Sequence, residues 1–192
     1  MDSSYLTNPL VFLVQTLFGL YTLVVLLRFL LQLVRADFYN PISQFIVKAT
    51  APPLRPLRRL IPGFSGIDLS SMVLAWLLKS VELMLILLIA GSGSVLGAFV
   101  WSVPQLVDLF INIFLFAILI QVILSWINPG AYNPATSLLH SLTEPLLGPA
   151  RRMLPPLSGL DLSPMVVMIG LVLLKMLLIP PLMVITGSPF PA

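Results

Sequence analysis

The chain has 192 residues, of which 58% are hydrophobic and 9% are charged, and its formal net charge is +3. A soluble globular domain is about 45–50% apolar and about 25% charged, so the composition excludes an ordinary water-soluble domain and indicates an integral membrane protein. The absence of cysteine excludes disulfides, thiolate metal sites and thiol nucleophiles.

The first apolar stretch, at about residues 9–34, follows a start without Lys or Arg and is too long for the hydrophobic region of a secretory signal. Further apolar stretches occur at about 71–90, 104–127 and 164–186. Each approaches the ~20 residues that a helix needs to cross the hydrocarbon core. A soluble helical bundle would need polar stripes on its outer helix faces, and these stretches have none. We therefore expect an all-α membrane protein with four transmembrane helices.

Two copies of one insert lie between these stretches. The segment "YNPISQFIVKATAPPLRPLRRLIPGFSGIDLS" begins at Tyr39, and "YNPATSLLHSLTEPLLGPARRMLPPLSGLDLS" begins at Tyr132, so the copies are 93 residues apart without a gap. This predicts an internal duplication, with one repeat over residues 1–97 and a second over 98–192. Because each repeat crosses the membrane twice, the second starts on the same side as the first, and the repeats are parallel.

Each insert is predicted to begin with a short amphipathic helix. Asparagine is a strong N-cap and proline suits the first helical position, as at Asn40 and Asn133. Apolar residues then recur with helical spacing, at Ile42, Phe45, Ile46 and Ala49 in one copy and at Ala135, Leu138, Leu139 and Leu142 in the other. This apolar face could lie in the membrane interface or pack against the spans. The prolines that follow are expected to end the helix and keep the chain extended.

The inserts also carry most of the positive charge. Their basic residues include Lys48, Arg55, Arg58, Arg59, Arg151 and Arg152, whereas both chain ends and the loop between the repeats carry none. The positive-inside rule therefore predicts cytoplasmic inserts and outside termini. The same cations could also attract anionic lipid headgroups, each contributing roughly 1 kcal/mol, or they could serve only to fix the topology.

An aspartate follows each arginine pair. Asp68 and Asp161 lie two residues before Ser70 and Ser163, which are predicted to cap the second and fourth spans. We expect each aspartate to fold back onto an arginine of its own insert and brace the loop. The alternative is a solvated acid near a helix N-terminus.

Several ionisable residues fall inside the predicted spans, where such residues are rare. Arg28 lies near a cytoplasmic end, where it could snorkel, and Asp108 lies near an outer end. Lys79, Glu82 and Lys175 lie near mid-span, and the 93-residue offset makes Glu82 and Lys175 equivalent. A two-fold axis along the membrane normal would bring this acid and base together. Both a buried ion pair and a polar path for ions or protons fit this pattern, and we favour the ion pair because four helices leave little room for a path.

The fixed spacing of Asn-Pro, Thr-x-Pro-x-Leu-x-Pro, Arg-Arg, Pro and Gly-x-Asp in both inserts resembles the duplicated repeat of the YggT family of bacterial integral membrane proteins. The resemblance covers nearly the whole chain and implies the bacterial inner membrane. It also implies a link to osmotic stress and ion balance, and similar plastid proteins act in cytochrome b6 maturation. The second repeat departs from the first where Gln121, Asn128 and Gly148 replace Arg28, Arg35 and Arg55 at the equivalent positions, so its insert is less basic.

The sequence argues against an enzyme, because His140 is the sole histidine, has no acid beside it, and is accompanied by no phosphate loop or paired carboxylates. No cofactor, metal or nucleic-acid partner is expected. The leading interpretation is a membrane organising or assembly factor, with anionic lipid, a membrane-protein client or a second copy of the chain as partner. The alternative is a small oligomeric ion channel or transport-related protein.

Overall fold

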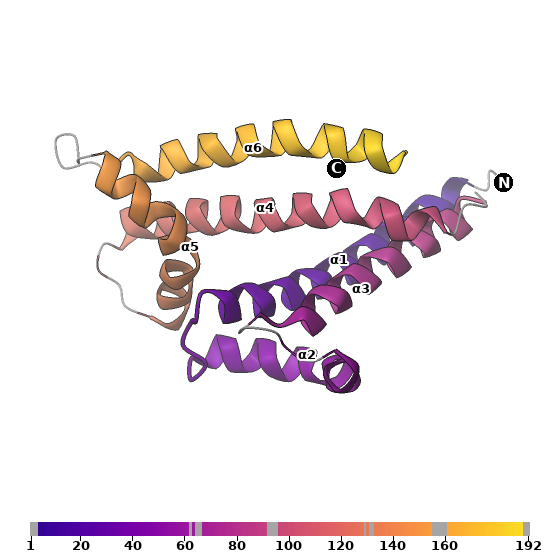
Figure 1. Ribbon diagram of the computed structural model, residues 1–192, viewed down its shortest axis with the longest axis horizontal. Helices are drawn as coiled ribbons and strands as arrows, with labels where there is room; N and C mark the ends of the chain where they lie inside the picture. Colours follow the sequence, from indigo (N-terminus) through magenta and orange to yellow (C-terminus); the bar gives the residue numbers. More distant parts are fainter. Residues whose placement is uncertain are drawn as a thin grey trace.

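The computed structural model describes residues 4–61, 63, 67–91, 96–128, 130, 133–154 and 161–189. Every regular element in these ranges is an α-helix: α1 (Ser4–Leu33), α2 (Pro41–Leu60), α3 (Leu69–Ile89), α4 (Gly97–Ile127), α5 (Pro134–Met153) and α6 (Ser163–Thr186). Figure 1 shows the start of α1 and the end of α6 at one end of the long helices and the insert helices α2 and α5 toward the other.

Four helices are long and apolar enough to cross a membrane, which confirms the four predicted spans. They comprise Thr7–Leu33, Leu69–Ile89, Gly97–Ile127 and Ser163–Thr186. The longest, α4, has 31 residues and so measures about 46 Å at 1.5 Å per residue. Because the hydrocarbon core is only about 30 Å thick, α4 must tilt or extend beyond it.

Each repeat forms a helical hairpin. Helix α1 packs on α3 and α4 packs on α6, while α2 and α5 each pack on both helices of their own hairpin. The main core gathers where α1, α3 and α4 meet, around the buried side chains of Val25, Leu26, Ala75 and Ile113. This junction joins the two repeats.

The relation between the repeats differs from the expected two-fold arrangement. Helix α4 contacts α3 and α6, but α6 contacts neither α3 nor α1 within the described residues. Figure 1 shows α4 between α6 and the crossing pair α1 and α3. Equivalent positions on α3 and α6 therefore do not face each other.

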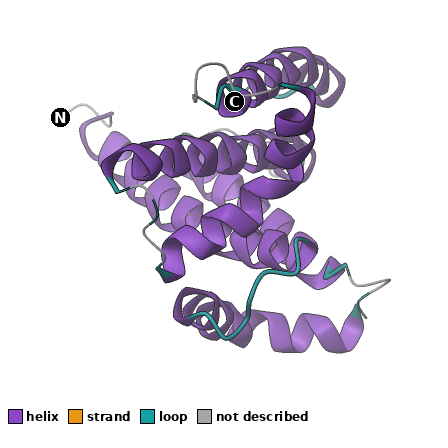
Figure 2. Ribbon diagram, turned by 90° about the vertical axis from the view of Figure 1, so that its left-hand side faces the viewer, coloured by secondary structure: helices purple, strands orange, loops and turns teal. Residues whose placement is uncertain are grey.

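The insert helices are longer than predicted. Helix α2 continues through Pro52, Pro53 and Pro56, and α5 continues through its own prolines. Proline inside a helix removes a hydrogen bond and bends the axis, and Figures 1 and 2 show α2 sharply bent. Leu54 and its equivalent Leu147 lie beyond the first prolines and are each only 1% exposed. Burial of these leucines holds the second half of each insert helix in place. Rules based on the residues next to a proline do not include such tertiary contacts, so they predict that the helix ends.

Candidate functional site

The start of each insert helix is capped as predicted. The Asn40 side chain accepts a hydrogen bond from the backbone N–H of Ile42 at 2.9 Å. Asn133 accepts from Ala135 and Thr136, both at 2.9 Å, and Thr136 returns a bond to complete a capping box. The Asn-Pro signature therefore fixes where both inserts begin.

The predicted apolar face of α2 is divided between two environments. Ile46 is 5% exposed and packs inward, whereas Ile42 is 38% and Phe45 is 66% exposed. The inward stripe instead runs through Ser43, Ile46, Thr50 and Leu54. The insert thus packs against the spans and keeps a large aromatic side chain on its outer side.

One arginine of each pair binds the aspartate that follows it. Arg58 forms an ion pair with Asp68, and at the equivalent positions Arg151 Nε lies 3.0 Å from Asp161 Oδ2. Arg151 also lies 2.8 Å from Glu144. Both predicted loop contacts are therefore present, and they involve the same arginine of each pair.

The helix caps next to these aspartates differ from the prediction. Asp68, not Ser70, is the N-cap of α3, and its side chain accepts from the backbone N–H of Ser71. Helix α6 begins at Ser163, whose N–H donates to Asp161 at 2.9 Å. A carboxylate at these positions can accept from a helix N–H with one oxygen and form an ion pair with an arginine through the other, whereas a serine hydroxyl carries no charge for the arginine.

These contacts decide the protonation of both carboxyl groups. Burial acts to raise the pKa of Asp68, but hydrogen bonds from Arg58 and Ser71 outweigh it, so the pKa is lowered overall. For Asp161, burial likewise opposes the hydrogen bonds from Ser163 and Arg151, and its pKa is also lowered. Both aspartates are ionised at neutral pH.

The remaining insert cations are exposed. Lys48, Arg55, Arg59 and Arg152 make no ion pair with any described residue. They extend along α2 and the end of α5, beside the arginines that bind aspartate. The inserts thus contain one set of cations that hold the loops and another set that face outward.

The mid-span charges form two separate pairs, and the predicted Glu82–Lys175 contact is wrong. Lys79 Nζ lies 2.8 Å from Glu82 Oε1, within α3. Lys175 Nζ lies 2.7 Å from Asp108 Oδ1 on α4 and 3.1 Å from the side-chain oxygen of Asn112. Because α4 separates α6 from α3, Lys175 reaches an acid on α4 instead.

Arg28 is also buried and does not snorkel. Its guanidinium donates to Thr50 Oγ1 at 2.7 Å and to the Val47 carbonyl at 3.0 Å, and the residue is 6% exposed. At the equivalent positions in the second repeat, the Thr143 hydroxyl bonds to Gln121. The threonine repeated in both inserts was the sequence signal for this contact between a span and its insert.

Two of the cavities lie beside polar residues of the spans. A cavity of about 350 Å³ between α1, α3 and α4 is lined by Lys79, Asp108, Asn112 and Gln105, so both mid-span ion pairs border it. Its lining also includes Gly19, which is equivalent to Asn112. This is the place where a polar ligand or water could reach the intramembrane charges.

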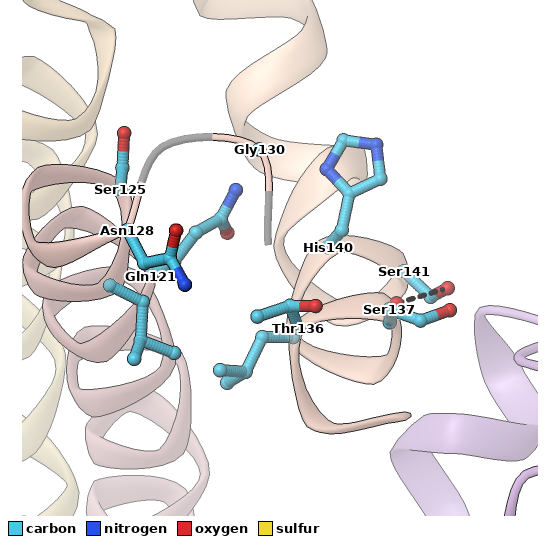
Figure 3. A pocket seen from close by; sticks show the side chains of 10 residues that line it. Gln121, Ser125, Asn128, Gly130, Thr136, Ser137, His140 and Ser141 are labelled. Atoms are coloured by element: carbon cyan, nitrogen blue, oxygen red, sulfur yellow. Dashed lines mark hydrogen bonds between the residues drawn. The ribbon is translucent and has the colours of Figure 1, made fainter. Parts of the chain in front are cut away.

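A second cavity, of about 380 Å³, lies between the end of α4 and the start of α5. Figure 3 shows Gln121 of α4, and Asn128 just after the end of α4, across from Thr136 on α5. His140 also borders it, and the Glu144 carboxylate lies 3.7 Å from His140 Nδ1. The expectation that no acid lies beside His140 is therefore wrong, because one helical turn brings residue i+4 onto the same face.

Comparison with known proteins identifies the family. A sequence model of the CCB3/YggT family matches residues 7–89 and again residues 100–182. The chain belongs to the CCB3/YggT family. Both ends of the two matches are offset by the 93 residues that separate the inserts, which supports the duplication.

The relatives are bacterial proteins without an assigned activity. An uncharacterised protein of Pseudomonas aeruginosa is 52% identical over 96% of this chain and 95% of its own length. An uncharacterised protein of Vibrio alginolyticus, named for the region 3′ of proC, is 45% identical over 85% of this chain and 90% of its own length. The uncharacterised protein YggT of Escherichia coli is 37% identical over 88% of each chain. No solved structure matches the chain.

Proposed function

We propose that this family member is a non-enzymatic organising protein of the bacterial inner membrane whose inserts form a cytoplasmic surface for anionic lipid headgroups and for a membrane-protein client. One observation carries the proposal: Lys48, Arg55, Arg59 and Arg152 are exposed and make no ion pair with a described residue. Cations near an anionic leaflet each contribute about 1 kcal/mol of attraction.

The two arginines of each pair differ in their contacts, and this difference supports the proposed function. Arg58 and Arg151 are held by aspartates and contribute to the fold, whereas Arg59 and Arg152 have no such contact within the described chain. An arginine that neither packs nor pairs adds little to stability, so its charge is available for an external anion. Phosphate groups of lipids are suitable acceptors for arginine.

The binding of anionic lipid can be measured by thermal unfolding of the detergent-solubilised full chain, titrated with phosphatidylglycerol or phosphatidylcholine. We expect phosphatidylglycerol to stabilise the wild type and phosphatidylcholine to have little effect. The double substitution Arg55→Gln with Arg59→Gln should weaken phosphatidylglycerol binding about 30-fold, because two contributions of about 1 kcal/mol are lost.

Charge and shape are separated by a matched control. Arg55→Lys with Arg59→Lys keeps both charges at the same positions and should retain most of the lipid response. The proposal would be refuted by a glutamine variant that binds phosphatidylglycerol as strongly as the wild type, or by equal stabilisation of the wild type with phosphatidylcholine.

A second function, ion conduction, is favoured by the polar cavity between α1, α3 and α4. Its lining brings Lys79 and Asp108 to one space, although each is neutralised by a partner, Glu82 and Lys175. Ion flux across sealed liposomes after an osmotic step distinguishes this candidate. Flux that disappears in Glu82→Gln protein shown to be folded would support a conduction path, and absence of flux with folded wild-type protein would leave the inserts as the functional surface.

A further inference from the structure

The main contact between the two repeats joins two helices that are not equivalent to each other, α3 of the first repeat and α4 of the second. In this chain α3 packs on α4, but the equivalent combination, α6 with α1, makes no contact within the described residues. A contact that pairs two different faces is heterologous and leaves one of each face unused at the ends of the array. Here the unused faces belong to α6 and α1.

The exposure of the spans follows this pattern. In the most apolar stretch of each span, 39% of the residues are buried in α3 but only 6% in α6. In the contact between the repeats, the hydroxyl of Ser80 on α3 lies 3.0 Å from that of Ser102 on α4. The equivalents of these serines are Leu173, which is 53% exposed, and Pro9, which is also exposed. The surfaces of α6 and α1 that are equivalent to this contact are therefore uncovered at these positions.

The inserts also contact each other across the repeats, through one leucine side chain and the residues around it. Leu138 of α5 is 6% exposed because it packs into a cleft of the first repeat formed by Leu31, Ala36 and Ile46. These three cleft residues are each 4–5% exposed. Leu138 thus acts as a knob that fastens the second insert to the first repeat.

The described residues at the equivalent positions form no such contact with each other. Leu124 and Leu139, the equivalents of Leu31 and Ile46, line the open cavity of about 380 Å³ between α4 and α5. Leu139 also packs on the main core, and the equivalent of Ala36 lies outside the described residues. Phe45, the equivalent of Leu138, projects from α2 and is 66% exposed. The chain therefore presents an exposed aromatic side chain on α2 and an open cavity between α4 and α5 at the equivalent of the surface that binds Leu138.

A polar contact accompanies the knob. The Asn40 side chain donates from Nδ2 to the Pro134 carbonyl at 2.7 Å, which joins the starts of α2 and α5. The equivalent residues, Asn133 and Pro41, are exposed. Asn133 uses its side-chain oxygen for capping, which leaves its amide nitrogen as the group that could donate in a second contact of this kind.

We propose that copies of this chain associate head to tail, with Phe45 of one copy seated in the α4–α5 cavity of the next and α6 of one copy beside α1 of the other. The contact between chains repeats the contact between repeats. Lipid chains could cover α6 alone, but a cavity at insert level matched by a knob on the same chain specifies a second copy. Such association closes into a ring or continues as a row. It does not depend on the lipid binding proposed above for the inserts.

Disulfide cross-linking tests the proposal directly because the chain contains no cysteine. Phe45→Cys and Leu139→Cys are placed on two differently tagged chains, co-expressed and oxidised in native membranes. We expect a covalent dimer that contains both tags, and little dimer from either variant alone. The matched control is Leu138→Cys with Ile46→Cys in one chain, which is the equivalent contact and should form within the chain.

Two results would overturn the proposal. The first is formation of the internal Leu138–Ile46 disulfide with no dimer between Phe45→Cys and Leu139→Cys. The second is a dimer from Phe45→Cys alone that is as abundant as the mixed dimer, since that indicates a symmetric contact instead.

A noncovalent measurement gives an independent result. Phe45→Ala should weaken self-association of the full chain in lipid nanodiscs or mild detergent about 30-fold, as for a central aromatic residue of an interface. Leu60→Ala is the control, because Leu60 is 78% and its equivalent Met153 is 81% exposed, which places this position outside the contact. Equal association of Phe45→Ala and wild type, with both folded, would contradict the inference.

Discussion

The two loop contacts allow one interaction to be compared in two environments within a single chain. The Asp68 side chain is 4% exposed and also binds the Ser71 hydroxyl at 2.7 Å, whereas the side chain of its equivalent, Asp161, is 45% exposed. Removing one member of a fully buried ion pair costs about 3–5 kcal/mol, and exposed pairs contribute about 0–1 kcal/mol. Arg58 is 43% exposed and can regain water, so we expect Asp68→Asn to cost about 2 kcal/mol.

Asp161→Asn should cost less than about 1 kcal/mol. Asparagine keeps the capping ability of aspartate, so both substitutions isolate the charge. Thermal unfolding in detergent, followed by tryptophan fluorescence, should show a decrease in Tm of about 4–8 °C for Asp68→Asn and less than about 4 °C for Asp161→Asn. Equal decreases for the two variants, or a larger one for Asp161→Asn, would refute the argument from burial.

The pH dependence provides a second test at Asp68. Because its pKa is lowered in the folded protein, its contribution is fully present above the unfolded value of about 3.9 and is lost as the pH falls through the folded value. The stability difference between wild type and Asp68→Asn should therefore be constant near neutral pH and decrease below about pH 4. A difference that persists unchanged under strongly acidic conditions would show that the charge is not its source.

Two further predictions concern the spans. The substitutions Glu82→Gln and Asp108→Asn should each destabilise the protein by about 3 kcal/mol, because each leaves a lysine without its ion-pair partner. Stability in detergent should recover when Lys79→Met is added to Glu82→Gln, or Lys175→Met to Asp108→Asn. It should not recover when the two lysine substitutions are exchanged. Arg28→Gln should cost less than Arg28→Met in the same unfolding assay, because the second repeat already bonds a glutamine to its insert threonine at the equivalent position; equal costs would contradict this.

The duplication and the four spans were determined by the sequence alone, because both rest on local patterns. The apolar length of each span satisfies the membrane thickness by itself, and the matched spacing of the inserts from Tyr39 and Tyr132 records the repeat directly. The Asn-Pro caps of α2 and α5 were likewise predictable, since the capping side chain and its N–H partner are two or three residues apart. The arginine–aspartate contacts were predictable for the same reason of proximity in the chain.

Only the tertiary structure decided how the two repeats meet. Sequence equivalence suggested that Glu82 and Lys175 face each other, but α4 packs between their helices, and each charge takes a nearer partner. Likewise, Leu54 stabilises helix beyond prolines that would otherwise end it. Equivalent sequences have equivalent local structure, yet their surroundings differ, because a heterologous contact covers one copy of each face and leaves the other exposed. That asymmetry separates the buried Leu138 from the exposed Phe45.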